Sequence, residues 1–296
     1  MGELYVRHEY WFAAVQLALA MLGMGATLRP ADFAAVLRVP IGVGVGLFTQ
    51  LVCVPLLALA VSRALSVPPG IAVGLMLVAA VPGGTMSNVL TWLAHGNTPL
   101  SIALTAISTL GCLVTTPLVM EIFASEHLAV DFAMPVARVS SEILLCLLGP
   151  LAAGMLLGAR RPAWREPLTR WGVRGSLFVI GLMVIGGAAS GRIDPAAYGW
   201  VAPLAIFGLA LAGMNAGMLC CRLLGLSSRD RIAIGIEAGV RNTNLALLIK
   251  ASVFPAVPGE PDPIADGAFF VALLYGAFAL PTVLPALLLH RRRARL

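Results

Sequence analysis

Long apolar runs separated by short polar loops dominate the chain. Nine runs of mostly apolar residues are each long enough to cross a bilayer as one helix. The loops between them carry most of the Pro, Arg and Asp residues. The runs cover approximately residues 10–28, 40–64, 70–94, 98–123, 135–158, 172–190, 198–224, 230–254 and 267–289. This pattern predicts an all-α polytopic membrane protein with nine transmembrane helices, forming a single domain over residues 1–296.

The composition narrows the class of protein. Hydrophobic residues make up 59% of the 296 residues and charged residues only 11%. A soluble domain needs about 25% charged residues, and a disordered chain has far fewer apolar ones. The net charge of +6 first suggests nucleic acid, but most of the basic residues lie in loops between spans or beside span ends. They indicate a lipid bilayer as the partner and no nucleic acid.

The distribution of basic residues predicts the orientation. If the C-terminus is cytoplasmic, fourteen Lys and Arg residues flank the spans on that side and four on the other. Basic residues accumulate in cytoplasmic loops, so we expect the N-terminus outside. Glu3 and Glu9 give the first residues mixed charge, and we interpret the first apolar run as a retained span rather than a signal peptide.

The third and eighth spans resemble each other. Residues 71–74 read Ile-Ala-Val-Gly and residues 232–235 read Ile-Ala-Ile-Gly, and each element precedes a stretch that interrupts a helix. An odd and an even span enter the bilayer from opposite faces, so the two copies form an inverted repeat. Interrupted helices at corresponding places of two inverted halves indicate the binding site of a transporter.

The interruptions have specific physical consequences. Pro82 removes a backbone donor, and Gly83 and Gly84 add backbone freedom, as Gly239 does in the other copy. The freed backbone groups must face protein, water or a ligand. The helix starts that follow offer N–H groups to an anion, and the carbonyls before them can bind a cation.

Two ionisable residues lie in the middle of the eighth span. A charge in mid-membrane costs at least ~2.5 kcal/mol and indicates function. Glu237 lies beside the break, and Arg241 follows four residues later. They form either a structural ion pair or a cation site in which Glu237 supplies the charge. Lys250, near the end of the span, is expected to extend its amine to the membrane–water interface.

Side chains with oxygen atoms gather in three of the predicted spans. Ser87 and Asn88 follow the first break, Ser101 and Thr105 share one face of the fourth span, and Gln50 lies in the second. Na⁺ is a hard cation that takes oxygen ligands, as Ca²⁺ does. Together with Glu237, they predict a Na⁺ site.

Three segments carry a resemblance to a known family. They are Val81-Pro82-Gly83-Gly84-Thr85-Met86-Ser87-Asn88 with Gly96-Asn97, then Glu237-Ala238-Gly239-Val240-Arg241-Asn242, and Gly23-Met24-Gly25-Ala26-Thr27-Leu28 with Asp32-Phe33. The chain resembles the bile acid:sodium symporter family over nearly its whole length. The resemblance implies a nine-helix bacterial version in the inner (plasma) membrane, with two crossing discontinuous helices. It further implies panel helices at about 10–28, 135–158 and 172–190, and core helices at about 40–123 and 198–289 with breaks near 82–85 and 238–241.

The resemblance also implies ligands. A first Na⁺ site would use Ser87, Asn88, Ser101, Thr105 and Glu237. A second would use Gln50, Glu237 and the carbonyls of Ala238 and Val240, with an oxygen from the next residue. Thr85 and Asn242 would contact the substrate.

One residue departs from the family pattern. The residue that would complete the second Na⁺ site is Arg241, which has no acceptor and stays charged. Our hypothesis is that its guanidinium replaces the second Na⁺. The alternative is that Arg241 swings into the cavity and binds the substrate carboxylate.

These observations predict a secondary transporter, not an enzyme, and the sequence carries no GxSxG, HExxH, GxxxxGK[ST] or CxxC motif. The favoured hypothesis is Na⁺-coupled symport of an organic anion by alternating access, with a bile-acid-like steroid or a small carboxylate such as pantoate as substrate. The second is a Na⁺-independent or proton-coupled carrier or exporter using Glu237 and Arg241. A third hypothesis is a receptor or channel subunit. It is disfavoured because a channel would line a continuous polar pore, and four of the nine spans show almost no polar side chain in mid-membrane.

Overall fold

The chain forms a bundle of helices. The computed structural model describes residues 2–29, 40–124, 128, 132–193 and 195–293. The helices are α1 (Gly2–Thr27), α3 (Pro40–Phe48), α4 (Val54–Ala64), α5 (Pro69–Ala80), α6 (Thr85–Leu93), α7 (Thr98–Ala124), α8 (Val136–Glu142), α9 (Gly149–Arg160), α10 (Arg165–Ala189), α11 (Pro195–Tyr198), α12 (Val201–Leu223), α13 (Ser228–Gly239), α14 (Thr243–Val253) and α15 (Pro263–Arg293). The π-helical turns η2 (Thr49–Cys53) and η4 (Ile143–Leu148) join α3 to α4 and α8 to α9, and the 3₁₀ turn η5 (Pro162–Trp164) precedes α10.

Long apolar helices confirm a polytopic membrane protein. Within the described residues, seven continuous helical segments are long and apolar enough to cross a membrane. The third and eighth predicted spans instead consist of two short helices each, α5 with α6 and α13 with α14. The first span is longer than predicted, because α1 already begins at Gly2 and buries Tyr5, Val6 and Glu9 in its early turns.

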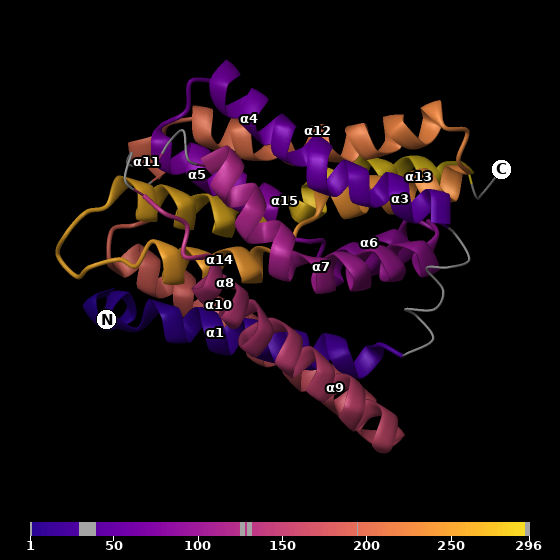
Figure 1. Cartoon of the computed structure of the whole chain (residues 1–296), viewed down its shortest axis with the longest axis horizontal. Coiled ribbons are helices and arrows are strands. Elements are labelled where there is room, and N and C mark those ends of the chain that lie inside the picture. The colour runs from indigo at the N-terminus through magenta and orange to yellow at the C-terminus, as the bar shows by residue number, and fades with distance from the viewer. Residues whose placement is uncertain (1, 30–39, 125–127, 129–131, 194, 294–296) are drawn as a thin grey trace.

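Three long segments form one side of the molecule. In Figure 1, α1, α9 and α10 lie together along the lower side, with α3–α7 and α12–α15 above them. Helix α1 contacts both α9 and α10. Glycines allow this close approach, since a Cβ at Gly172 would lie 2.9 Å from the Cα of Gly23. The side of α1 that faces away from α9 and α10 is therefore available to the rest of the bundle.

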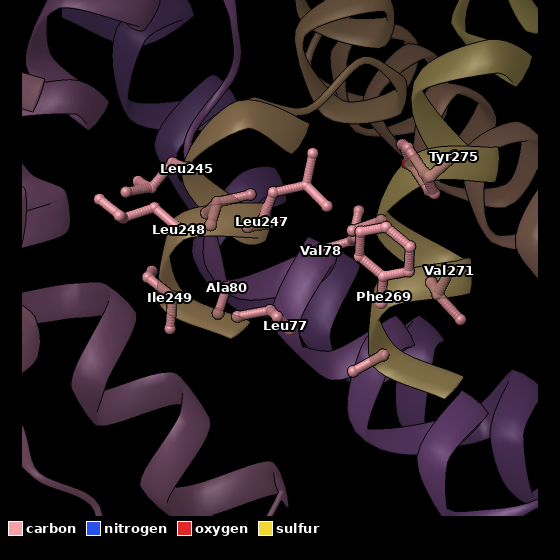
Figure 2. Packing of buried hydrophobic residues seen from close by; sticks show 14 of the residues in the cluster. Leu77, Val78, Ala80, Leu245, Leu247, Leu248, Ile249, Phe269, Val271 and Tyr275 are labelled. Atoms are coloured by element: carbon pink, nitrogen blue, oxygen red, sulfur yellow. The ribbon is translucent and has the colours of Figure 1, made fainter. Parts of the chain in front are cut away.

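Helix α5 lies at the centre of the bundle. Every residue from Gly70 to Ala80 is buried, as expected for a helix that is apolar on all sides. Leu77 and Val78 of α5 belong to one buried cluster with Leu248 of α14 and Phe269 of α15, and Figure 2 shows Val78 beside Phe269. This core fixes the positions of the two short helices whose ends define the site described below.

The crossing of α5 and α15 yields a stability prediction. A Cβ at Gly74 would lie 2.7 Å from Val271 Cβ and 2.9 Å from Ala268 Cα. Gly74→Leu is expected to lower the melting temperature, because overpacking costs about 1–3 kcal/mol. Gly208→Leu is the control, since no described atom outside its own helix lies within 4 Å of its Cβ position. Thermal unfolding in detergent measures both variants, and equal melting temperatures would contradict the crossing.

Candidate ion and substrate site

The two helix breaks meet in the middle of the bundle. Helix α5 ends at Ala80 and α6 begins at Thr85, while α13 ends at Gly239 and α14 begins at Thr243. Val81, which precedes Pro82, is extended, as residues before proline tend to be. These are the positions where the sequence predicts interruptions.

The two breaks satisfy each other's backbone groups. Gly83 and Arg241 form an antiparallel β-bridge, and the N–H of Asn242 donates to the carbonyl of Pro82 at 2.8 Å. The hydroxyl of Tyr275 on α15 donates to the carbonyl of Gly239 at 3.0 Å. The side-chain oxygen of Asn242 accepts from Leu245 N at 3.2 Å and caps α14. Unwound backbone is thereby stabilised inside the protein.

A buried carboxylate lies under one break and is surrounded by hydroxyls. The hydroxyls of Ser87, Ser101 and Thr105 donate to Glu237 Oε1 at 2.6, 2.6 and 2.7 Å. The side-chain oxygen of Asn88 lies 2.8 Å from the Ser101 hydroxyl and 3.2 Å from that of Thr105. Glu237 is completely buried. Helices α6, α7 and α13 thus bring five predicted oxygen ligands to one point.

The second carboxylate oxygen is not satisfied. Among the described residues, Glu237 Oε2 has no hydrogen-bond partner. It lies against Gly83, where a Cβ would overlap it. An unpaired anionic oxygen in a buried site is costly, and five convergent oxygens suit a hard cation. The residues present therefore fit a bound Na⁺.

Arg241 points away from Glu237. Its Nη2 donates to the carbonyl of Ala79 at 2.7 Å and its Nε to that of Val78 at 3.4 Å, while Nη1 lies 3.4 Å from Gln50 Oε1. Within the described residues no ion pair joins Arg241 to Glu237. Of the two alternatives, the structural ion pair is not formed among the described residues, because α13 ends between Glu237 and Arg241.

Of the second group of predicted ligands, Gln50 contacts this guanidinium. Gln50 lies in the π-helical turn η2, a feature frequent at functional sites. Its Oε1 accepts from Gly83 N at 3.3 Å and from Arg241. Ala238 and Val240 are buried beside Glu237 in the chain. Arg241 thus contacts Gln50, one member of the second predicted ligand set.

A cavity lies next to the breaks. Its volume is about 450 Å³, and it is bounded by α1, α10, the two breaks and α15. Thr85, Arg241 and Asn242, the three predicted substrate contacts, line it, and Met24 and Leu177 contribute to its mainly apolar wall. Helices α6 and α14 both begin at this cavity, so it receives the positive ends of two helix dipoles.

Three buried charged residues, Glu9, Arg192 and Lys250, and the partly buried Asp266 form a network that no sequence pattern indicates. Lys250 Nζ donates to both carboxylate oxygens of Glu9, at 2.9 and 2.7 Å. Arg192 lies 3.1 Å from Glu9 and also pairs with Asp266. The expectation that Lys250 reaches the interface is wrong, because its side chain is 0% exposed. Local pattern could not reveal this pairing, since Glu9 and Lys250 are 241 residues apart.

Comparison with known proteins identifies the family of the chain. A sequence model described as the Sodium Bile acid symporter family matches residues 14–190. The chain belongs to this family. Its members are sodium-coupled transporters and not enzymes, which confirms the resemblance seen in the motifs.

Curated relatives come from distant organisms. An uncharacterized sodium-dependent transporter of Bacillus subtilis is 34% identical over 86% of this chain and 78% of its own length. A probable chloroplastic sodium/metabolite cotransporter of Arabidopsis thaliana is 32% identical over 81% of this chain and 59% of its own length. The human ileal sodium/bile acid cotransporter is 27% identical over 90% of this chain and 74% of its own length. The chain spans less than two thirds of the plant relative.

The two glycines of the first break give a matched pair of variants. A Cβ at Gly83 would overlap Glu237 Oε2, whereas a Cβ at Gly84 would lie 3.4 Å from the nearest described atom. Gly83→Ala is expected to displace the carboxylate and lower the melting temperature, because the crowded buried group costs about 1–3 kcal/mol. Gly84→Ala is expected to stay close to the wild-type value. Thermal unfolding of both variants tests the contact, which is refuted if they melt together.

Proposed function

We propose that the protein is a secondary transporter that couples uptake of an organic anion to Na⁺. The observation that carries the proposal is the completely buried carboxylate of Glu237 with three hydroxyls on one oxygen and no described partner on the other. A hydroxyl can turn its lone pairs toward a cation when the cation binds. Na⁺ would then neutralise a carboxylate that is costly to hold within a membrane.

The proposed first Na⁺ site uses Ser87, Asn88, Ser101, Thr105 and Glu237. These side chains come from α6, α7 and α13, so a bound ion would hold the two broken helices together. Asn242 and Thr85 begin the adjacent half-helices. Na⁺ binding would thus fix the geometry of the helix starts that face the anion, which gives a physical route for coupling.

The cavity favours an amphipathic anion. Its volume of about 450 Å³ lies within the range of about 300–1,000 Å³ typical of small-molecule sites. Thr85, Asn242 and the dipoles of two helices lie at the polar end, and apolar side chains form the wall. A bile-acid-like steroid and a small carboxylate such as pantoate are the two substrates to compare.

Nine spans and alternating access complete the proposal. Each broken pair counts as one span, so the described helices give nine, with the N-terminus outside the bacterial inner membrane and the C-terminus in the cytoplasm. The antiparallel contact of the two breaks supports an inverted repeat. Helices α1, α8–α9 and α10 would form the panel, the remaining spans the core, and the cavity between them would open to each side in turn.

Arg241 is proposed to occupy the place of a second Na⁺. Its guanidinium contacts Gln50 and the last carbonyls of α5, where a helix presents its negative dipole end. Transport would then use one Na⁺ in each cycle.

Uptake into proteoliposomes tests the coupling. Labelled taurocholate or pantoate is expected to enter faster under an inward Na⁺ gradient, and Glu237→Gln is expected to lower the stimulation at least about tenfold, because the ion loses its charged ligand. Ser101→Ala should lower the apparent Na⁺ affinity. Ser108→Ala is the control, since that hydroxyl bonds the carbonyl of Leu104 in its own helix. Uptake that follows a proton gradient and ignores Na⁺ would refute the proposal and favour the proton-coupled alternative.

The Na⁺ dependence of Arg241 variants tests the stoichiometry. The Hill coefficient is bounded by the number of sites, so it is expected to be about 1 in the wild type. Arg241→Gln should raise it toward about 2 by restoring an oxygen ligand. Arg241→Lys, which keeps the charge, should leave it unchanged. An unchanged coefficient in Arg241→Gln together with lost substrate binding would instead show that Arg241 binds the substrate.

A further inference from the structure

The four-charge network of Glu9, Arg192, Lys250 and Asp266 lies between two cavities. On one side, a cavity of about 530 Å³ is lined by Val6, Arg192 and Asp266. On the other, the substrate cavity is lined by Met21 and Leu247. Along α1 the order is Val6, Glu9 and Met21, and along α14 it is Leu247 and then Lys250. The network therefore separates the two spaces.

The members of the network alternate between the two proposed domains. Lys250 on α14 and Asp266 on α15 belong to the proposed core, and Glu9 on α1 and Arg192 after α10 belong to the panel. Both strong core-to-panel contacts join opposite charges, Lys250 with Glu9 at 2.7 Å and Asp266 with Arg192. The four charges sum to zero, so the closed interface can bury them.

Neighbouring contacts join the same two surfaces. Ser252, two residues beyond Lys250, donates to Glu142 of α8 at 2.6 Å. Phe269 of α15 lies under both cations, with its ring centre 4.7 Å from Arg192 Cζ and 5.7 Å from Lys250 Nζ. Figure 1 shows α14, α8, α10 and α1 lying close together at the end that contains the N-terminus, and α14 contacts both α1 and α8.

The same short helix links the network to the substrate site. Helix α14 begins with Thr243 at the break, and Lys250 lies seven residues later, about 10 Å along the helix axis. A rigid helix of this length transmits displacement of its start to its end. A change of the break on ion or substrate binding would thus reach the Lys250–Glu9 pair.

We propose that the four-charge network is the gate that closes the outer end of the carrier and opens in each transport cycle. The inference rests on the proposed transport function and assigns Lys250 and Glu9 as positioning residues that act through the core–panel contact. With the pairs formed, the substrate cavity is shut from the outer cavity. When core and panel separate, the charges exchange their partners for water.

Thiol labelling tests the gate without Na⁺ or substrate. Ala13 lies one turn beyond Glu9 on the same face of α1 and is completely buried. Ala13→Cys is treated with a membrane-impermeant maleimide from outside in right-side-out spheroplasts, and modification of residue 13 is quantified by peptide mass spectrometry. The intact gate should protect this thiol.

The double variant Glu9→Gln with Lys250→Met is the main arm. It removes the charges of both partners, so neither is left as an isolated buried charge. A single variant would leave the other partner charged, buried and without its ion pair. Labelling from outside is expected to rise about tenfold, because an outward-open state that was populated at about 10% or less becomes a major one. Arg170→Met, which removes an exposed charge, should leave labelling unchanged.

Two further outcomes complete the test. If the double variant does not fold, Ser252→Ala replaces it and should raise labelling in the same direction by a smaller factor. The gate is overturned if the thiol at residue 13 stays as protected in the folded double variant as in the protein with the intact network. If the double variant does not fold, the same result in Ser252→Ala overturns the gate. Labelling needs no coupling ion, so the two proposals can fail separately. If labelling rises in the double variant but the wild-type protein shows no Na⁺-driven uptake, the proposed function is refuted and the gate is retained.

Discussion

The requirement that buried backbone groups find partners determines the centre of this molecule. Two helices stop within the bundle, and each stop releases N–H and C=O groups that hydrocarbon cannot satisfy. The structure resolves this by placing the two interruptions against each other, through the Asn242–Pro82 hydrogen bond and the Gly83–Arg241 bridge. Because the interruptions must meet, the half-helices that follow them must also begin at the same place, beside the cavity.

This arrangement keeps the charges of one short segment apart. Glu237 is the third-last residue of α13 and Arg241 lies after the helix ends, so their side chains diverge into different surroundings. Hydroxyls surround the carboxylate, and the carbonyl end of α5 surrounds the guanidinium. A continuous helix would have brought the two together and neutralised both. The interruption leaves the carboxylate without a charged partner among the described residues, as the proposed Na⁺ site requires.

The second group of buried charges has a different character. In the four-charge network each charged group forms an ion pair with a group from a separate segment, whereas no ion pair joins Glu237 to a cation of the described residues. A matched network stabilises one arrangement of the helices, and an unmatched carboxylate invites a ligand. The second break follows the helix that carries Glu237, and α14 runs from that break to Lys250, so the break connects the proposed ion site to the proposed gate.

The sequence by itself determined the family, the all-helical membrane class and the positions of the interruptions. Apolar run length, the Pro82-Gly83-Gly84 string and the mid-membrane Glu237 are local signals, and the physics that they report acts over a few residues. The roles of the predicted ligands stay predictions. Only the tertiary structure decided where Arg241 points and that Lys250 pairs with Glu9, because the direction of a side chain after a break and a contact across 241 residues depend on how distant helices pack. The position of Lys250 near the end of a span favoured an exposed amine, but only the packed bundle could supply a buried partner for it.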